Sequence, residues 1–289
     1  MKNILTRSRA VYAENRAKSL PNATACEMLD EKTIRTYLFD EVSRMYPNSL
    51  FFHTLLLNGN AKRFVDETDE EGNTLLHICA WYNHSDILLL LLHVPKGRKL
   101  IDAVNEEGKT ALLIALEQES FESARILIES GANLHIGKTP PLIAALKSNG
   151  EDIARLLIEY GCDIHAMESF ERTSLAWAIE KRMIDLSIDL IARGVKPEEK
   201  DFNGDTALIK ACKQKGCERI ITALIDSGAD IHNPNKDGRM PVFFAESWIQ
   251  IRHPELMNRK GELKKSFEEG MESINKNMEE IWTSALNKQ

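Results

Sequence analysis

One stretch decides the fold: residues 201–232, which read DFNGDTALIKACKQKGCERIITALIDSGADIH. Its first four residues have the composition of a tight turn. A short apolar segment follows Thr206, a second follows the polar residues 213–216, and Gly228 stands where a glycine ends a helix. Neither predicted helix is long enough to be stable alone in water, and each has an apolar face that needs a neighbour. The stretch therefore predicts copies of itself beside it.

The copies are present at a regular spacing. Aligned on Thr206, the units recur at intervals of 30 to 36 residues, at Thr74, Thr110, Pro140, Thr173, Thr206 and Met240. Residues 69–80 read DEEGNTLLHICA, and residues 131–133, 161–163 and 228–230 read GAN, GCD and GAD. A turn and two helices with a period of about 33 residues, together with these motifs, resemble the ankyrin repeat.

The resemblance implies an all-α fold class, an ankyrin-repeat solenoid of helix-turn-helix units with β-hairpin-like fingers. We expect a helical extension in residues 1–48 and the repeats in residues 49–250. The repeats comprise a worn first repeat, five recognisable units and a degenerate last unit. Residues 251–289 contain an amphipathic helix. Both ends are expected to cap the solenoid; a partner-binding C-terminal helix is the alternative.

Two places depart from the repeat pattern. Residues 94–100 are an insertion, which predicts a lengthened loop. The unit that starts at Pro140 lacks the usual Asp-x-x-Gly, and residues 137–141, GKTPP, lead directly into its first helix. We expect its finger to be stunted.

Composition restricts the class of protein. The chain of 289 residues is 43% hydrophobic and 28% charged, as in soluble folded proteins. Its net charge of −7 argues against a nucleic-acid binder, whose surface should be basic. The longest aliphatic run, residues 87–92, is too short to span a membrane. Residues 1–20 lack the apolar core of a secretory signal, so a cytoplasmic protein is expected. We also expect the protein to be a monomer.

The sequence contains no catalytic motif that we recognise, so we predict no enzyme, no catalytic residue and no cofactor. His135, His165 and His232 share one repeat position. Neighbouring repeats lie roughly 10 Å apart, whereas zinc needs ligands at about 2 Å, so no metal site is predicted. The five cysteines form no C-x-x-C pair and are expected to be reduced, Cys79 in a small buried position and Cys217 as a free thiol in a polar turn.

In the ankyrin family the partner usually lies along the concave face, which consists of the finger tips and the ends of the first helices. Large aromatic residues stand there where the fold does not need them, with charged and polar residues beside them. The predicted partner-binding residues are Trp81, Tyr82, Phe170, Phe202, Glu106, Lys109, Arg172, Asn203 and Asp205. Aromatic residues dominate binding hot spots, so the predicted function is a non-enzymatic scaffold that binds another protein. The alternative is that the rings fold back onto neighbouring repeats.

Two rival functions stay open. Residues 20–48 would serve a ubiquitin-ligase adaptor, since Leu20-Pro21 followed by Met28-Leu29 weakly resembles the start of an F-box. An enzyme with an unrecognised site in a terminal extension would need a polar pocket with perturbed titratable groups.

The C-terminal segment carries one further resemblance. Glu268-Glu-Gly-Met-Glu272 precedes an apolar C-terminus, and this block resembles the export signal of Dot/Icm-type type IV secretion substrates. Many of those are ankyrin proteins that intracellular bacteria place in a host cell. The resemblance implies a secretion signal at Glu268, Glu269 and Glu272 and a bacterial effector acting on host proteins. The same block is also typical of an ordinary solvated helix.

Overall fold

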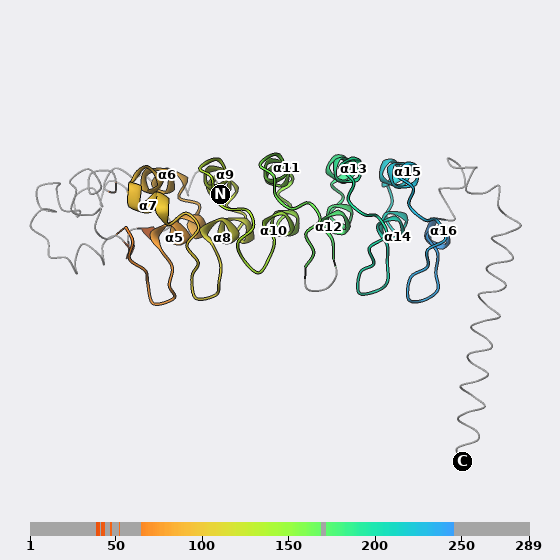
Figure 1. Ribbon diagram of the computed structural model, residues 1–289, viewed down its shortest axis with the longest axis horizontal. Coiled ribbons are helices and arrows are strands. Elements are labelled where there is room, and N and C mark those ends of the chain that lie inside the picture. The colour runs from red at the N-terminus through yellow and green to blue at the C-terminus, as the bar shows by residue number, and fades with distance from the viewer. Residues whose placement is uncertain are drawn as a thin grey trace, which may run out of the picture. The chain divides into compact units, whose positions relative to one another are not determined.

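The computed structural model describes residues 39–40, 42–43, 47, 52, 65–168 and 172–245 (Figure 1). Within these residues the regular elements are helices, and strand pairing is limited to isolated antiparallel bridges at Thr68–Thr74, Val104–Thr110 and Met167–Thr173. The predicted all-α class is confirmed. The expected C-terminal cap and most of the expected N-terminal cap and worn first repeat lie outside the described residues.

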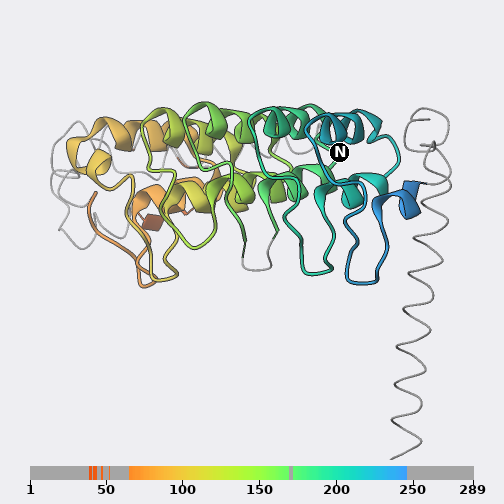
Figure 2. The same cartoon turned by 45° about the vertical axis from the view of Figure 1, so that its right-hand side comes forward.

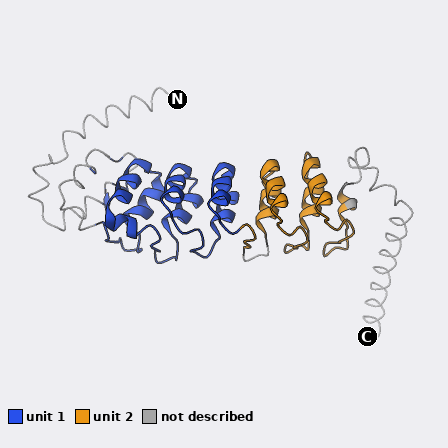
Figure 3. Ribbon diagram, turned by 45° about the horizontal axis from the view of Figure 1, so that its top comes forward, with its two compact units in different colours: residues 1–163 blue, residues 164–289 orange. Residues whose placement is uncertain are grey.

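The chain divides into two compact units, residues 1–163 and residues 164–289 (Figure 3). The helices of unit 1 are α5 (Leu75–Tyr82), α6 (Ser85–His93), α7 (Pro95–Lys99), α8 (Ala111–Glu117), α9 (Phe121–Glu129), α10 (Pro141–Lys147) and α11 (Glu151–Glu159). Those of unit 2 are α12 (Ser174–Glu180), α13 (Ile184–Ala192), α14 (Ala207–Cys212), α15 (Glu218–Asp226) and α16 (Pro241–Ala245).

Each unit is built from two layers of helices. In unit 1, the first helices α5, α8 and α10 pack side by side, and the second helices α6, α9 and α11 form the other layer. In unit 2, α12, α14 and α16 are the first helices, and α13 and α15 are the second. In both units the fingers project from the side of the first helices (Figures 1 and 2).

The first helices begin where the repeat alignment predicts. The side chains of Thr110, Thr173 and Thr206 each accept a hydrogen bond from the backbone N–H three residues later, at 3.3, 3.1 and 3.3 Å. This N-cap satisfies a donor that the helix leaves unpaired. At the other end of the unit, Gly228 has φ +89° just after α15, a conformation that favours glycine and ends the helix. The register of the repeats is confirmed.

Small residues line the contacts between neighbouring first helices. Cys79, Ala115 and Ala145 of unit 1 are 0% exposed, as are Ala178 and Ala211 of unit 2. They occupy the same position in their repeats, where a larger side chain would push adjacent helices apart. Cys79 therefore acts as a small apolar residue, as predicted.

Residues 95–99 form the short helix α7, so the prediction of a lengthened loop for the insertion is wrong. Pro95 stands at the first position of the helix, where its ring fits the required backbone and its missing N–H costs nothing. Gly97 approaches α6 so closely that a Cβ would lie 2.1 Å from the carbonyl oxygen of Leu91. The insertion is thus packed against the repeat.

The connection before α10 agrees with a stunted finger. In the described residues 133–140 no antiparallel bridge forms, and α10 starts directly after Pro140. Gly137 has φ +116°, and a Cβ there would lie 2.2 Å from Cδ1 of Leu113. Glycine is required because the shortened chain runs over the first helix of the preceding repeat.

Cys217 is not the exposed thiol that its polar neighbours suggest. Its side chain is 0% exposed, and burial raises the pKa of the thiol. It is the residue directly before α15, where the chain turns into the core. Cys79, Cys162, Cys212 and Cys217, the cysteines of the described part, are all buried.

Candidate functional site

Side-chain oxygens hold the two regular fingers of unit 1. Asp69 accepts hydrogen bonds from the N–H groups two and four residues ahead, at 2.9 and 2.8 Å, and Asn105 does the same at 3.1 and 3.0 Å. Asn105 Nδ2 donates to Asn73 Oδ1 at 2.8 Å, and the N–H of Glu106 donates to the carbonyl of Glu71 at 3.1 Å. The two fingers therefore form one hydrogen-bonded ladder.

His77 joins this ladder to the helices. Its Nδ1 accepts from the N–H of Thr74 at 3.1 Å, so Nε2 carries the proton and donates to the carbonyl of Lys109 at 3.0 Å. Burial lowers the pKa of His77, although backbone hydrogen bonds oppose that shift. The neutral ring is therefore a structural bridge between repeats.

Trp81 and Tyr82 are the last two residues of α5. They are 51% and 44% exposed, and the Tyr82 ring stacks on His84 with centroids 5.7 Å apart. Neither ring folds back into the core. Unit 1 thus presents two large amphipathic side chains to solvent at the end of a fixed helix.

Carboxylates dominate the charge of the finger that leads into α8, residues 101–110. Lys109 lies between Glu107 and Glu117, with its Nζ 2.9 Å from a carboxylate oxygen of each. These hydrogen bonds, to Glu117 first and then Glu107, raise the pKa of Lys109. The predicted contact residue Glu106 is exposed on the same finger. The ammonium of Lys109 is neutralised within the unit, whereas Glu106 faces solvent.

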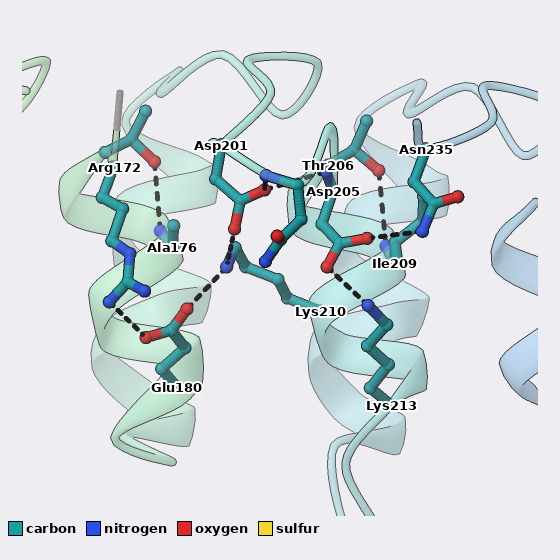
Figure 4. Close-up of polar contacts among 12 residues, drawn as sticks. Arg172, Ala176, Glu180, Asp201, Asp205, Thr206, Ile209, Lys210, Lys213 and Asn235 are labelled. Carbon is teal, nitrogen blue, oxygen red and sulfur yellow. Dashed lines mark hydrogen bonds and ion pairs between the residues drawn. The ribbon is translucent and has the colours of Figure 1, made fainter. Parts of the chain in front are cut away.

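The same finger ladder recurs in unit 2 (Figure 4). Asp201 accepts from the N–H groups two and four residues ahead, both at 2.9 Å, and Asn235 does so at 3.0 Å. Asn235 Nδ2 donates to Asp205 Oδ1 at 3.0 Å, and the N–H of Lys236 donates to the carbonyl of Asn203 at 3.1 Å. Two fingers of this unit are again fixed to each other.

A buried lysine is added to the ladder of unit 2. Lys210 Nζ lies 2.5 Å from Asp201 Oδ2 and 2.5 Å from Glu180 Oε1, and its side chain is 7% exposed. Glu180 also pairs with Arg172 at 3.4 Å (Figure 4). Burial raises the pKa of Asp201, but hydrogen bonds from Lys210 and two backbone N–H groups more than offset it, and the net pKa is lowered.

Sequence reasoning missed Lys210, although the alignment carried a signal. The equivalent positions of the other units hold apolar residues: Ile78, Ile114, Ala144, Trp177 and Phe244. A lysine at a position that is otherwise apolar requires a buried carboxylate partner. Asp201 of the preceding finger and Glu180 of the preceding first helix supply two.

Among the predicted residues of unit 2, Phe202 and Asn203 lie exposed on one finger, and Phe202 is 69% exposed. Lys236 of the next finger places its Nζ 5.0 Å from the Phe202 ring centroid. Phe170 lies outside the described residues. The phenyl ring of Phe202 is thus a solvent-facing feature of its finger.

The side chains of Arg172 and Asp205 make contacts with other residues of unit 2. Arg172 is half-buried, with its guanidinium carbon 5.0 Å from the Trp177 ring centroid. Asp205 was expected at the finger tip, but it is 4% exposed and pairs with Lys213 at 2.5 Å and with Asn235. Its carboxylate turns inward because it accepts from the neighbouring repeat. Asp205 therefore supports the finger and offers no surface of its own.

The described residues contain no group of three or more His, Cys, Asp and Glu side chains placed to hold a metal ion. The carboxylates around Lys210 form ion pairs instead. None of the helices in the described part has the length and apolar character needed to cross a bilayer.

Comparison with known proteins agrees with this architecture. The family model described as ankyrin repeats (3 copies) matches residues 45–138, 96–168 and 142–235. The nuclear factor NF-kappa-B p105 subunit of Gallus gallus is 28% identical over 186 residues, which are 64% of this chain. The match spans only 16% of that relative's length, so it concerns one region of a larger protein.

Solved structures show the same fold. The ankyrin repeat domain of human ASB11 has a TM-score of 0.59 at 21% identity, covering 73% of this chain and 92% of that domain. An ankyrin repeat domain from Acinetobacter baumannii AYE has a TM-score of 0.53 at 27% identity, covering 60% of this chain and 90% of that one. With a family match over more than half of its length, this chain belongs to the ankyrin-repeat family, whose repeats are a protein–protein interaction module.

Proposed function

We propose that this chain is a non-enzymatic scaffold that binds a partner protein on the side formed by its fingers and first helices. The observation that carries the proposal is the exposure of Trp81 and Tyr82, at 51% and 44%, at the end of α5. Tryptophan and tyrosine are the residues most enriched in binding hot spots. Exposed aromatic surface that the fold does not need is typical of a contact site.

The helix that carries these two rings is held to the fingers by hydrogen bonds. The ladder through Asn73 and Asn105, with the His77 bridge, holds the fingers beside α5 in one arrangement. A surface that is already ordered loses less conformational entropy on binding. The same hydrogen bonds would keep the surface unchanged when the rings are removed.

The test compares partners captured by proximity labelling with the full chain and two variants. Trp81→Ala with Tyr82→Ala removes the proposed anchors. The control is Tyr160→Ala, since Tyr160 is also 51% exposed but follows the second helix α11. We expect a protein captured by the parent and the control to be lost with the double variant. The affinity of that protein, measured with purified components, should fall by about 2 kcal/mol or more, roughly thirtyfold. Equal capture by all three chains would refute the assignment of this surface.

The effector role stays a proposal from the sequence, because Glu268, Glu269 and Glu272 lie outside the described residues. In a translocation reporter assay, removal of residues 261–289 should abolish transfer into a host cell. Changing the three glutamates to alanine should reduce it while the repeats stay folded. Normal transfer of the truncated chain would contradict secretion by this route. The adaptor and enzyme alternatives also rest on terminal segments, and no contact in the described part favours them.

A further inference from the structure

The finger side of unit 2 carries cations that lie against aromatic rings. Three such pairs are present, Lys236 over Phe202, Arg239 over Phe243 and Lys213 over Phe244, with the cation 5.0, 5.0 and 4.6 Å from the ring centroid. Phe243 and Phe244 also meet edge to face, with centroids 5.3 Å apart. A ring attracts a cation through its quadrupole but leaves the net charge in place. We name these six residues the unit 2 face.

Three carboxylates of unit 2 already form ion pairs. Asp201 and Glu180 bind Lys210, and Asp205 binds Lys213 and Asn235 (Figure 4). Within the described residues, neither Lys236 nor Arg239 forms an ion pair, although both are exposed. Asp237 is the exposed acid between them on the finger. With Asp237 counted, Lys236 and Arg239 leave this finger with one net positive charge.

This positive charge is local. The whole chain carries −7, and the corresponding tips of the unit 1 fingers hold Glu70, Glu71, Glu106 and Glu107. The tips in unit 2 hold Phe202 and Asn203 in one finger and Lys236 and Asp237 in the next. At the four positions where unit 1 has acids, unit 2 has one ring, one amide, one cation and one acid.

We infer that the unit 2 face docks an acidic segment of a partner protein that also carries apolar side chains; the inference rests on the proposed function. Lys236 and Arg239 offer charge-assisted hydrogen bonds to carboxylates, which the Arg239 guanidinium can bind with two parallel bonds. Phe202 and Phe243, 69% and 47% exposed, offer apolar surface between those charges. Complementary charge would favour encounter and select against basic partners.

Cations and exposed rings also occur in proteins that bind single-stranded nucleic acids. On the unit 2 face, two cations, Lys236 and Arg239, form no ion pair within the described residues, and the chain as a whole is acidic. Nucleic-acid affinity depends on neutralising many phosphates, which this chain would repel. An acidic protein segment therefore fits the unit 2 face better than a nucleic acid does. A single-stranded oligonucleotide is included in the test as a comparison probe.

The test uses the full chain and the fluorescence anisotropy of a labelled peptide that repeats Glu-Glu-Leu. Peptides of the same length that repeat Lys-Lys-Leu or Gln-Gln-Leu, and a single-stranded oligodeoxythymidine, are the comparison probes. We expect the Glu-Glu-Leu peptide to bind at least about tenfold more tightly than the others, and to weaken as salt is added. Equal or tighter binding of the Lys-Lys-Leu peptide or of the oligonucleotide would overturn the inference.

Three double variants test whether the peptide binds at the unit 2 face. Lys236→Glu with Arg239→Glu should weaken binding of the Glu-Glu-Leu peptide by about tenfold or more. The control, Lys196→Glu with Arg219→Glu, makes the same charge change at exposed positions of unit 2 outside the face and should not. Phe202→Ala with Phe243→Ala tests the rings without a change of charge. Circular dichroism must show that each variant is folded; equal weakening by both charge variants would mean that only net charge matters and would refute the inference.

The two proposals fail in different ways. If the peptide does not bind but capture through Trp81 and Tyr82 persists, only the acidic segment is refuted. If the peptide binds and depends on Lys236 and Arg239 while no partner is lost with the Trp81 and Tyr82 variant, the unit 1 surface is refuted instead.

Discussion

Replacing Lys210 with methionine is the most informative test of how unit 2 is held together. Methionine keeps the length and most of the volume of the lysine stem and removes only the ammonium. In the parent that ammonium lies 2.5 Å from both Asp201 and Glu180, and the side chain is 7% exposed. The variant therefore leaves two carboxylates beside a site without a cation.

The structure sets the size of the effect. Breaking a fully buried ion pair by removing one partner costs about 3–5 kcal/mol. Glu180 is 27% exposed and keeps Arg172, and Asp201 keeps two backbone N–H donors at 2.9 Å. We therefore expect the free energy of unfolding to fall by about 2–3 kcal/mol, below the upper part of that range.

Urea unfolding followed by circular dichroism measures this loss, and its pH dependence identifies the cause. In the parent the pKa of Asp201 is lowered from 3.8, so its contribution is present above that value and is lost as pH falls through the folded pKa. In the variant Lys210 no longer lowers the pKa of Asp201, so less stability is lost as the pH falls. The difference between parent and variant should shrink as pH falls below 3.8.

A second substitution should restore stability. Asn105 and Asn235 make the same two finger hydrogen bonds as Asp201 without a charge. Asp201→Asn combined with Lys210→Met should therefore be more stable than Lys210→Met alone. As a control, Arg219→Met breaks an ion pair whose side chains are 67% and 65% exposed and should cost under about 1 kcal/mol. The reasoning would be refuted by a Lys210→Met variant as stable as the parent, or by a loss of unfolding free energy that does not change with pH.

Three further tests concern single positions. Ala178→Leu should lower stability by about 1–3 kcal/mol, because the residue is 0% exposed where first helices meet; an unchanged melting temperature would mean that the repeat register is wrong. Gly137→Ala should cost about 1–3 kcal/mol more than Gly131→Ala, since its Cβ would meet Leu113 whereas Gly131 has open space; equal losses in urea unfolding would speak against the close approach. Because burial lowers the pKa of His77 from 6.5, the unfolded chain takes up that proton first, and stability should fall as pH drops below 6.5; a His77→Gln variant that keeps the full slope would assign it to another group.

Much of the fold could be predicted because it is encoded by local patterns. Thr110, Thr173 and Thr206 cap their helices, Gly228 ends one, and Ala178 and Ala211 are buried where the alignment places them. Each of these roles depends on a backbone or packing requirement that recurs along the repeats. The insertion at residues 94–100 was misjudged because no other repeat contains it, so the pattern could not indicate that Pro95 starts a helix.

The candidate surfaces were predicted less completely. The sequence indicated that Trp81, Tyr82 and Phe202 are not needed by the core, and all three are exposed. It could not indicate that Asp205 turns inward, since a charged residue next to a finger tip is exposed or buried according to the partners it meets. Cys217 shows the reverse case, a residue among polar neighbours whose side chain enters the core.

The sequence by itself determined the repeat, its register and the family, because short helices of this period are stable only when stacked. Only the tertiary structure decided which charges neutralise one another. Lys210 meets Glu180, about 30 residues earlier, and Asn235 meets Asp205 at the same separation. A repeat brings residues one period apart into contact, and the strength of an ion pair depends on burial and on distances of a few ångströms. The free positive charge of Lys236 and Arg239 therefore became visible only once the neighbouring acids were found to be paired.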